Sequence, residues 1–179
     1  QEHFAGRSRE IALELVGYVQ EALAARLPEL AWMDPDTRAE AAGKLETIHD
    51  KIGHPERWRD YSGLAVAHDS YFEARAAARR FEFARRLGHY KEPVDLREWY
   101  MTPPVVNAYY TPFGNQIVFP AGILQPPFFD ASYPGAMNFG GIGMVIGHEI
   151  THGFDDGGRK FDASGRMRPW WTPEAVARF

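Results

Sequence analysis

The chain has 179 residues, of which 45% are hydrophobic and 14% aromatic, a composition that supports a folded core and excludes a disordered chain. Its formal net charge of -4 gives no basic field, so nucleic acid is not an expected partner. The sequence has no cysteine, which excludes disulfides and thiolate metal sites and leaves histidine and carboxylate as metal ligands. No apolar run approaches the roughly 20 residues of a membrane-spanning helix, so no membrane segment is predicted in this chain.

Two helices are predicted near the start of the chain. Apolar residues at every fourth position predict an amphipathic helix over residues 8–27. Asp34 followed by Pro35 is typical of an N-cap with proline in the first turn, and the apolar stripe that follows predicts a second helix as far as Ile52. Gly53 would end this helix.

A third helix is predicted over residues 69–87, ending near Gly88. It carries several arginines, which could form an anion-binding stripe. Because Glu73 and Glu82 alternate with them, a solvated, ion-paired face is the favoured interpretation, and the helix is assigned no function.

The pattern changes after Pro93. Residues 105–110 are β-branched and aromatic, as is typical of a strand, and residues 116–119 follow a turn-like segment as the return strand. A hairpin is therefore predicted. Residues 120–129 are apolar but rich in proline, which predicts an irregular segment on the core.

A helix predicted over residues 138–154 carries the motif around which the chemistry is expected. His148, Glu149 and His152 form H-E-x-x-H, the zinc-protease signature. On a helix, histidines four positions apart can reach one metal ion, and the glutamate between them can act as the base that takes a proton from an attacking water. A chance match on a surface helix is the alternative, since only three positions are fixed.

The residues around the motif favour the metal site over a chance match. Met144, Ile146 and Ile150 predict a helix buried on most sides. Its start is rich in glycine, and each glycine weakens a helix by about 1 kcal/mol relative to alanine. Close packing against another part of the backbone would explain these glycines.

Aspartates follow the motif at positions 155, 156 and 162 and suggest a calcium loop, but their spacing lacks the terminal glutamate of such a loop. A plain acidic turn is the favoured interpretation. Thr172 and Pro173 then predict the start of a last helix.

Three long stretches of the sequence resemble the neprilysin family of zinc metalloendopeptidases, which are gluzincins. These stretches are residues 106–110, 115–129 and 140–156. The resemblance continues through residues 32–34 and 51–55 and reaches Trp170 and Trp171, so it covers essentially the whole chain.

The resemblance implies an α+β, mostly α-helical fold. Residues 67–179 would form the N-terminal part of a thermolysin-like (neprilysin-type) catalytic domain, and residues 1–66 a helical segment of a second, lid-like domain. The implied activity is hydrolysis of internal peptide bonds in small peptides, because a lid-like domain would exclude folded proteins. The implied compartment is extracellular or periplasmic.

The resemblance also implies roles for individual residues. His148 and His152 would be ligands of one Zn²⁺ ion, and Glu149 the general base. Asn107 and Ala108 match the substrate-binding edge strand of the family. An edge strand can bind an extended peptide as an added strand, although an ordinary hairpin strand is the alternative.

The third zinc ligand of neprilysin-like enzymes is a glutamate from a helix well beyond the second histidine, and we expect it from the remaining C-terminal part of the same protein. Glu174 is the alternative within this chain, but Arg178 stands where the family has an aspartate. We therefore expect the chain alone to be incomplete and inactive. The other interpretation is a catalytically inactive peptide-binding or interaction module that needs a partner chain for the third ligand.

Overall fold

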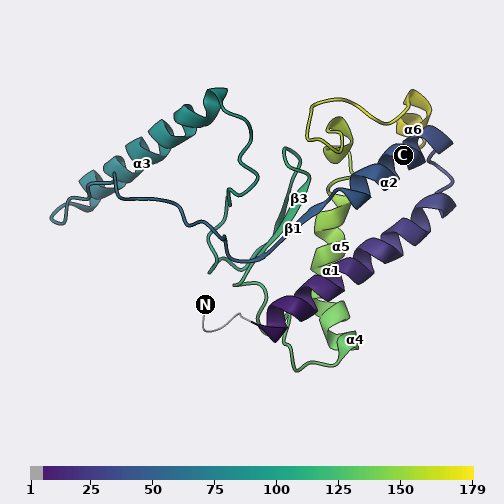
Figure 1. The fold of residues 1–179 in the computed structure, drawn as a ribbon, viewed down its shortest axis with the longest axis horizontal. Coiled ribbons are helices and arrows are strands. Elements are labelled where there is room, and N and C mark those ends of the chain that lie inside the picture. The colour runs from purple at the N-terminus through teal and green to yellow at the C-terminus, as the bar shows by residue number, and fades with distance from the viewer. Residues whose placement is uncertain (1–5) are drawn as a thin grey trace. The chain divides into compact units, whose positions relative to one another are not determined.

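A computed structural model of the chain describes residues 6–179, and these fall into two compact units. The first unit combines the residues up to His54 with Trp99–Phe179, and the second is Pro55–Glu98. The architecture is α+β and mostly helical, as predicted (Figure 1). The predicted division between two domains at residue 66 concerns the complete protein and stays a prediction.

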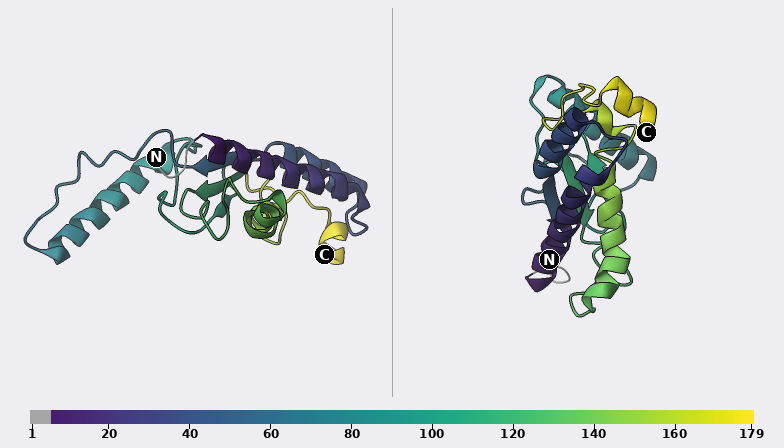
Figure 2. Two further views of the ribbon diagram at one scale, coloured as in Figure 1. Left: turned by 90° about the horizontal axis from the view of Figure 1, so that it is seen from below. Right: turned by 90° about the vertical axis from the view of Figure 1, so that its right-hand side faces the viewer.

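The first unit begins with two of the predicted helices, α1 (Arg7–Arg26) and α2 (Pro35–Glu46). Asp34 is the N-cap of α2, and its carboxylate accepts a hydrogen bond of 2.9 Å from the backbone N–H of Thr37. Figure 2 shows α1 running beside the motif helix, and residues of the two helices belong to one hydrophobic core.

The predicted extension of the second helix to Ile52 is wrong. Helix α2 ends at Glu46, and strand β1 (His49–Gly53) follows, parallel to β3 (Gln116–Pro120). Apolar residues four positions apart fit one face of a strand as well as one face of a helix, because four is a multiple of the strand period of two. The parallel partner, more than sixty residues away, decides between the two structures.

The predicted hairpin is present, but its first strand is shorter than predicted. Strand β2 (Tyr109–Thr111) pairs antiparallel with β3, and the sheet has the order β1-β3-β2. Continuing this register would place Asn107 opposite Pro120, which has no N–H to donate, so the ladder cannot continue there. Strand β2 is thus an edge strand within the described residues, and Asn107 and Ala108 lie directly before it.

The motif helix is not a regular helix throughout. It consists of α4 (Gly135–Asn138), a π-helical segment (Phe139–Gly143) and α5 (Met144–Thr151). The backbone N–H of Ile142 donates to the carbonyl oxygen of Phe128 at 2.8 Å. A Cβ on Gly141 would clash with the same carbonyl, so the predicted close approach of another backbone segment is confirmed at this glycine.

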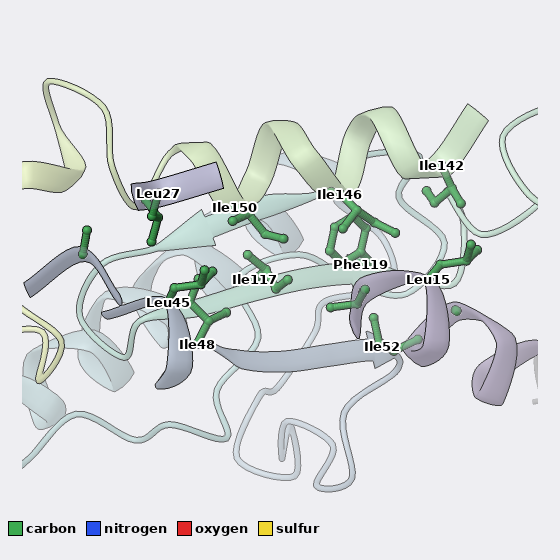
Figure 3. Close-up of a cluster of buried hydrophobic side chains, with 14 of the residues drawn as sticks. Leu15, Leu27, Leu45, Ile48, Ile52, Ile117, Phe119, Ile142, Ile146 and Ile150 are labelled. Atoms are coloured by element: carbon green, nitrogen blue, oxygen red, sulfur yellow. The ribbon is translucent and has the colours of Figure 1, made fainter. Parts of the chain in front are cut away.

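The core of the first unit lies between α5, the sheet and α1. Ile142, Ile146 and Ile150 point toward Ile117 and Phe119 of β3, with Leu15 of α1 beside them (Figure 3). The opposite side of α5 is open in the described chain, where the side chain of Met144 is 63% exposed. The prediction of burial on most sides therefore does not hold within residues 6–179.

The remaining helices agree with the sequence. In the second unit, α3 (Tyr71–Gly88) is capped by Ser70, and Arg85 pairs with Glu82 and Glu98 on an ion-paired face. In the first unit, α6 (Pro173–Arg178) begins at its Thr172 cap. No described helix is both long enough and apolar enough to cross a bilayer.

Candidate metal centre

Helix α5 brings the three residues of the motif together. The Nε2 atoms of His148 and His152 lie 3.1 Å apart. The residues are four positions apart, slightly more than one turn, so their rings leave the helix in similar directions. Both histidines are exposed, whereas Glu149 between them is only 5% exposed.

The separation of the two ring nitrogens fits a shared zinc ion. Two imidazole nitrogens that bind one Zn²⁺ at about 2.0–2.1 Å with a near-tetrahedral angle lie about 3.3 Å apart. The observed separation of 3.1 Å is close to that value. Imidazole is also a ligand that suits zinc.

The carboxylate of Glu149 is held between α5 and the edge strand. Burial raises the pKa of Glu149, while the nearby His152 and His148 and a hydrogen bond from the backbone of Tyr110 oppose that rise. Because Glu149 belongs to α5 and Tyr110 to β2, this hydrogen bond connects the motif helix to the edge strand.

Asp155 orients one of the histidines. Its Oδ2 lies 2.8 Å from Nδ1 of His152, on the opposite side of the ring from the nitrogen that faces His148. Its Oδ1 accepts hydrogen bonds of 2.8 and 2.7 Å from the backbone N–H groups of Gly157 and Gly158. Burial raises the pKa of Asp155, but the bonds from Gly158, His152 and Gly157 outweigh it and lower the pKa below its usual value. Asp155 is therefore a charged acceptor for His152.

The motif opens into a cleft of about 480 Å³. His148, Glu149 and His152 line it together with Asn107 and Ala108, from the start of the edge strand. The structure thus places all five predicted site residues around one cleft. Asn107 is exposed, and its side-chain oxygen accepts a hydrogen bond of 2.9 Å from the N–H of Ala108.

A third zinc ligand is not brought to the histidines within residues 6–179, where no three histidine, cysteine or acidic side chains form a group that could hold a metal ion. Glu174, the alternative within the chain, is exposed on α6 and does not line the cleft. The origin of the third ligand in the remaining part of the protein stays a prediction.

Two sequence profiles, both described as peptidase family M13, match residues 1–55 and 107–179. Together they cover more than half of the chain. The chain belongs to peptidase family M13. This membership, together with the named relatives that follow, confirms the predicted resemblance to the neprilysin family.

Named M13 relatives match nearly the whole chain. Human "Membrane metallo-endopeptidase-like 1" is 45% identical in an alignment 188 positions long, which covers 100% of this chain and 24% of that protein. Human neprilysin is 42% identical over 98% of this chain and 24% of its own length. An "Endothelin-converting enzyme homolog" of Locusta migratoria is 41% identical over 100% of this chain and 26% of its own length. The chain spans about a quarter of the length of these relatives.

Solved structures share the fold. The zinc metalloprotease Zmp1 of Mycobacterium tuberculosis in complex with an inhibitor is 47% identical with a TM-score of 0.86, over 95% of this chain and 26% of that one. PepO of Lactobacillus rhamnosis HN001 is 34% identical with a TM-score of 0.85, over 98% of this chain and 28% of that one. The described fold is thus part of the architecture of M13 metalloproteases.

Two contributors to the site were not identified from the sequence. The sequence marks Asp155 only as part of an acidic turn, although its position three residues after His152 places it within one helical turn of that predicted ligand. Tyr110 was interpreted only as a strand residue. No sequence signal marks its backbone as a partner of Glu149, because that contact depends on how β2 packs against α5.

Proposed function

We propose that the protein carrying this chain is a zinc-dependent endopeptidase that hydrolyses internal bonds of small peptides. One observation carries the proposal: the two Nε2 atoms lie 3.1 Å apart beside a buried glutamate, in the same cleft as an edge strand. Membership of family M13 supports it.

His148 and His152 would hold the zinc ion through Nε2, and Asp155 would keep the ring of His152 oriented by accepting from Nδ1. Zinc, when bound, supplies a Lewis acid that polarises the scissile carbonyl and makes water more acidic. A third, anionic ligand is expected from the part of the protein beyond these residues.

Glu149 acts as the general base in this proposal. Its carboxylate takes a proton from the attacking water and passes it to the leaving amine. The carboxylate is buried and accepts from the backbone of Tyr110, which leaves an oxygen lone pair for the water.

The edge strand would bind the peptide. An extended peptide can add alongside β2 through backbone hydrogen bonds, which do not depend on the peptide's side chains. Asn107 is exposed in the cleft, so its amide N–H₂ can donate to a peptide carbonyl while its oxygen accepts from Ala108. The extracellular or periplasmic compartment implied by the resemblance is part of this proposal.

A catalytically inactive peptide-binding module is the second candidate. The observation that favours it is the edge strand with Asn107 exposed in the cleft, which could bind an extended peptide without a metal ion. Zinc content and turnover of a quenched internal peptide distinguish the two. One zinc per complete protein, with turnover that a chelator abolishes and added zinc restores, supports the peptidase. Peptide binding without metal or turnover supports the module.

A further inference from the structure

A buried lysine contacts the turn that follows the candidate metal centre in the chain. The side chain of Lys44 on α2 is only 1% exposed. Its Nζ donates to the carbonyl oxygen of Gly158 at 2.8 Å and to that of Phe161 at 2.7 Å. The rings of Tyr110, Phe154 and Trp170 surround it, with centroids 5.8, 6.0 and 5.4 Å from Nζ. A charged group that loses its water needs such partners to be tolerated in a protein interior.

The carbonyls that Lys44 binds belong to the turn that holds His152. We call residues 155–161 the Asp155 turn. Its Gly158 packs backbone to backbone on the end of α5, and a Cβ there would clash with the carbonyl groups of His152 and Gly153. The N–H of the same Gly158 donates to Asp155, whose other oxygen holds Nδ1 of His152. The path from Lys44 to the predicted zinc ligand is therefore a continuous series of hydrogen bonds.

Lys44 is also connected to the edge strand. Its backbone carbonyl accepts a bond of 2.8 Å from the side chain of Asn115, and the oxygen of that side chain accepts one of 2.9 Å from the hydroxyl of Tyr110. The backbone of Tyr110 in turn bonds to Glu149. One position of α2 is thus connected to both supports of the site, directly to the Asp155 turn and through Asn115 to β2.

We propose that Lys44 is a positioning residue of the candidate metal centre, which holds the Asp155 turn against the end of α5 so that Asp155 fixes the ring of His152. The inference rests on the proposed function, because it assigns Lys44 to the zinc site of that function. Lys44 itself does not line the cleft. It therefore acts through the turn and not on a substrate.

The physical reason lies in the two carbonyl groups. Without the ammonium group, the carbonyl of the buried Gly158 would keep only the N–H of Phe161 as a donor, at 3.1 Å, and the carbonyl of Phe161 would lose the bond from Lys44. A carbonyl withdrawn from water that loses a donor is costly. The turn can regain partners only by moving toward water. Such a movement would carry Asp155 away from Nδ1 of His152.

The test uses the complete protein in four forms. These are the wild type, Lys44→Met, Asp155→Asn and the double variant. Methionine keeps the long apolar stem of lysine but removes every donor. Leu45→Ala is the matched control, since the neighbouring Leu45 on the same helix is buried in the core and its apolar side chain cannot hydrogen-bond to the turn. The readout is zinc affinity, measured by competition with a chelator.

We expect Lys44→Met to weaken zinc binding about 10- to 100-fold, the range seen when a group that orients a metal ligand is lost. Leu45→Ala should lose stability but keep zinc affinity within about threefold. In the Asp155→Asn background, Lys44→Met should cause less than a threefold further loss, because the two residues act along one path.

Several results would overturn the proposal. Unchanged zinc affinity of Lys44→Met would do so, and so would losses that multiply in the double variant, because Lys44 would then act without Asp155. If Lys44→Met does not fold, Lys44→Gln replaces it with the same criteria, since its shorter amide cannot reach both carbonyls. If the wild type itself binds no zinc, the proposed function fails, and this inference fails with it.

Discussion

Replacing Asp155 by asparagine tests the support of the metal centre with little other change. The asparagine oxygen can still accept from the N–H groups of Gly157 and Gly158, which now bond to Oδ1 at 2.8 and 2.7 Å. The amide NH₂ takes the place of Oδ2, which lies 2.8 Å from Nδ1 of His152. A zinc ligand that binds through Nε2 carries its proton on Nδ1, so two donors would then face each other.

The expected loss follows from that single contact. Removing the acceptor behind a metal-bound histidine typically weakens zinc binding about 10- to 100-fold, which corresponds to about 1.4 to 2.7 kcal/mol. The fold should lose little stability, because the oxygen that caps the turn remains. Chelator competition on the complete protein measures the zinc affinity, and thermal unfolding of the zinc-free protein measures the stability.

Asp156→Asn is the matched control, since it removes the same charge from the neighbouring, exposed position. A general electrostatic effect would weaken the zinc binding of both variants by similar factors. If Asp155→Asn binds zinc within threefold of the wild type, or no more weakly than Asp156→Asn, the orienting role of Asp155 is refuted.

Three further outcomes are expected in the complete protein. Glu149→Gln should keep its zinc but lose about 10² to 10⁴ in turnover, since an amide cannot take a proton from water; more than a tenth of wild-type activity at equal zinc content would contradict the role of general base. Asn107→Ala should raise KM and lower kcat/KM by a factor equivalent to about 1 kcal/mol, and a collapse of thermal stability instead would make Asn107 structural. Burial lowers the pKa of Lys44 to about 8 from an ordinary value of 10.5, against the opposing charges of Asp162 and Asp155. The unfolded chain then binds more protons between these values, so the unfolding free energy of the wild type relative to Lys44→Met should rise by about 2 kcal/mol from about pH 7 to about pH 9.5. If denaturant titrations give the two proteins the same pH dependence of the unfolding free energy, folding does not lower the pKa of Lys44 and the prediction is wrong. Above about pH 10 the raised pKa of Tyr110 lowers the unfolding free energy of both proteins, so the comparison is made below that pH.

The sequence predicted those parts of the fold that depend on local signals. The N-cap of α2 at Asp34 and the start of α6 at Pro173 are confirmed, because both combine a capping side chain with a proline in the first turn. Strand β1 was missed because its pattern fits two periods and its partner β3 is distant in sequence. The first strand of the hairpin was predicted too long, because its pairing ends where Pro120 cannot donate.

The same distinction explains which parts of the candidate site could be predicted. The predicted metal-binding pair is visible in the sequence because a helix fixes the relation between positions four apart, so His148 and His152 lie close together wherever that helix forms. The contacts that support the site follow no such rule of sequence spacing. Lys44 bonds to a carbonyl 114 positions further along the chain, and which carbonyl it meets depends on the path of a turn.

The supporting network also changes what the motif by itself implies. The hydrogen bonds that lead from Lys44 through Gly158 and Asp155 to His152 all lie within the first unit. Together they connect helix α2, near the start of the chain, to the Asp155 turn. A related chain could therefore keep His148, Glu149 and His152 unchanged and still bind zinc poorly, if the lysine or Asp155 were replaced. The imidazole rings are exposed and can rotate about their side-chain bonds unless Nδ1 is held by an acceptor. An ion that must first order these side chains binds more weakly, because ordering them costs conformational entropy. In this chain both Asp155 and Lys44 are present and bonded, so the proposed function predicts that the ring of His152 is already oriented for a zinc ion.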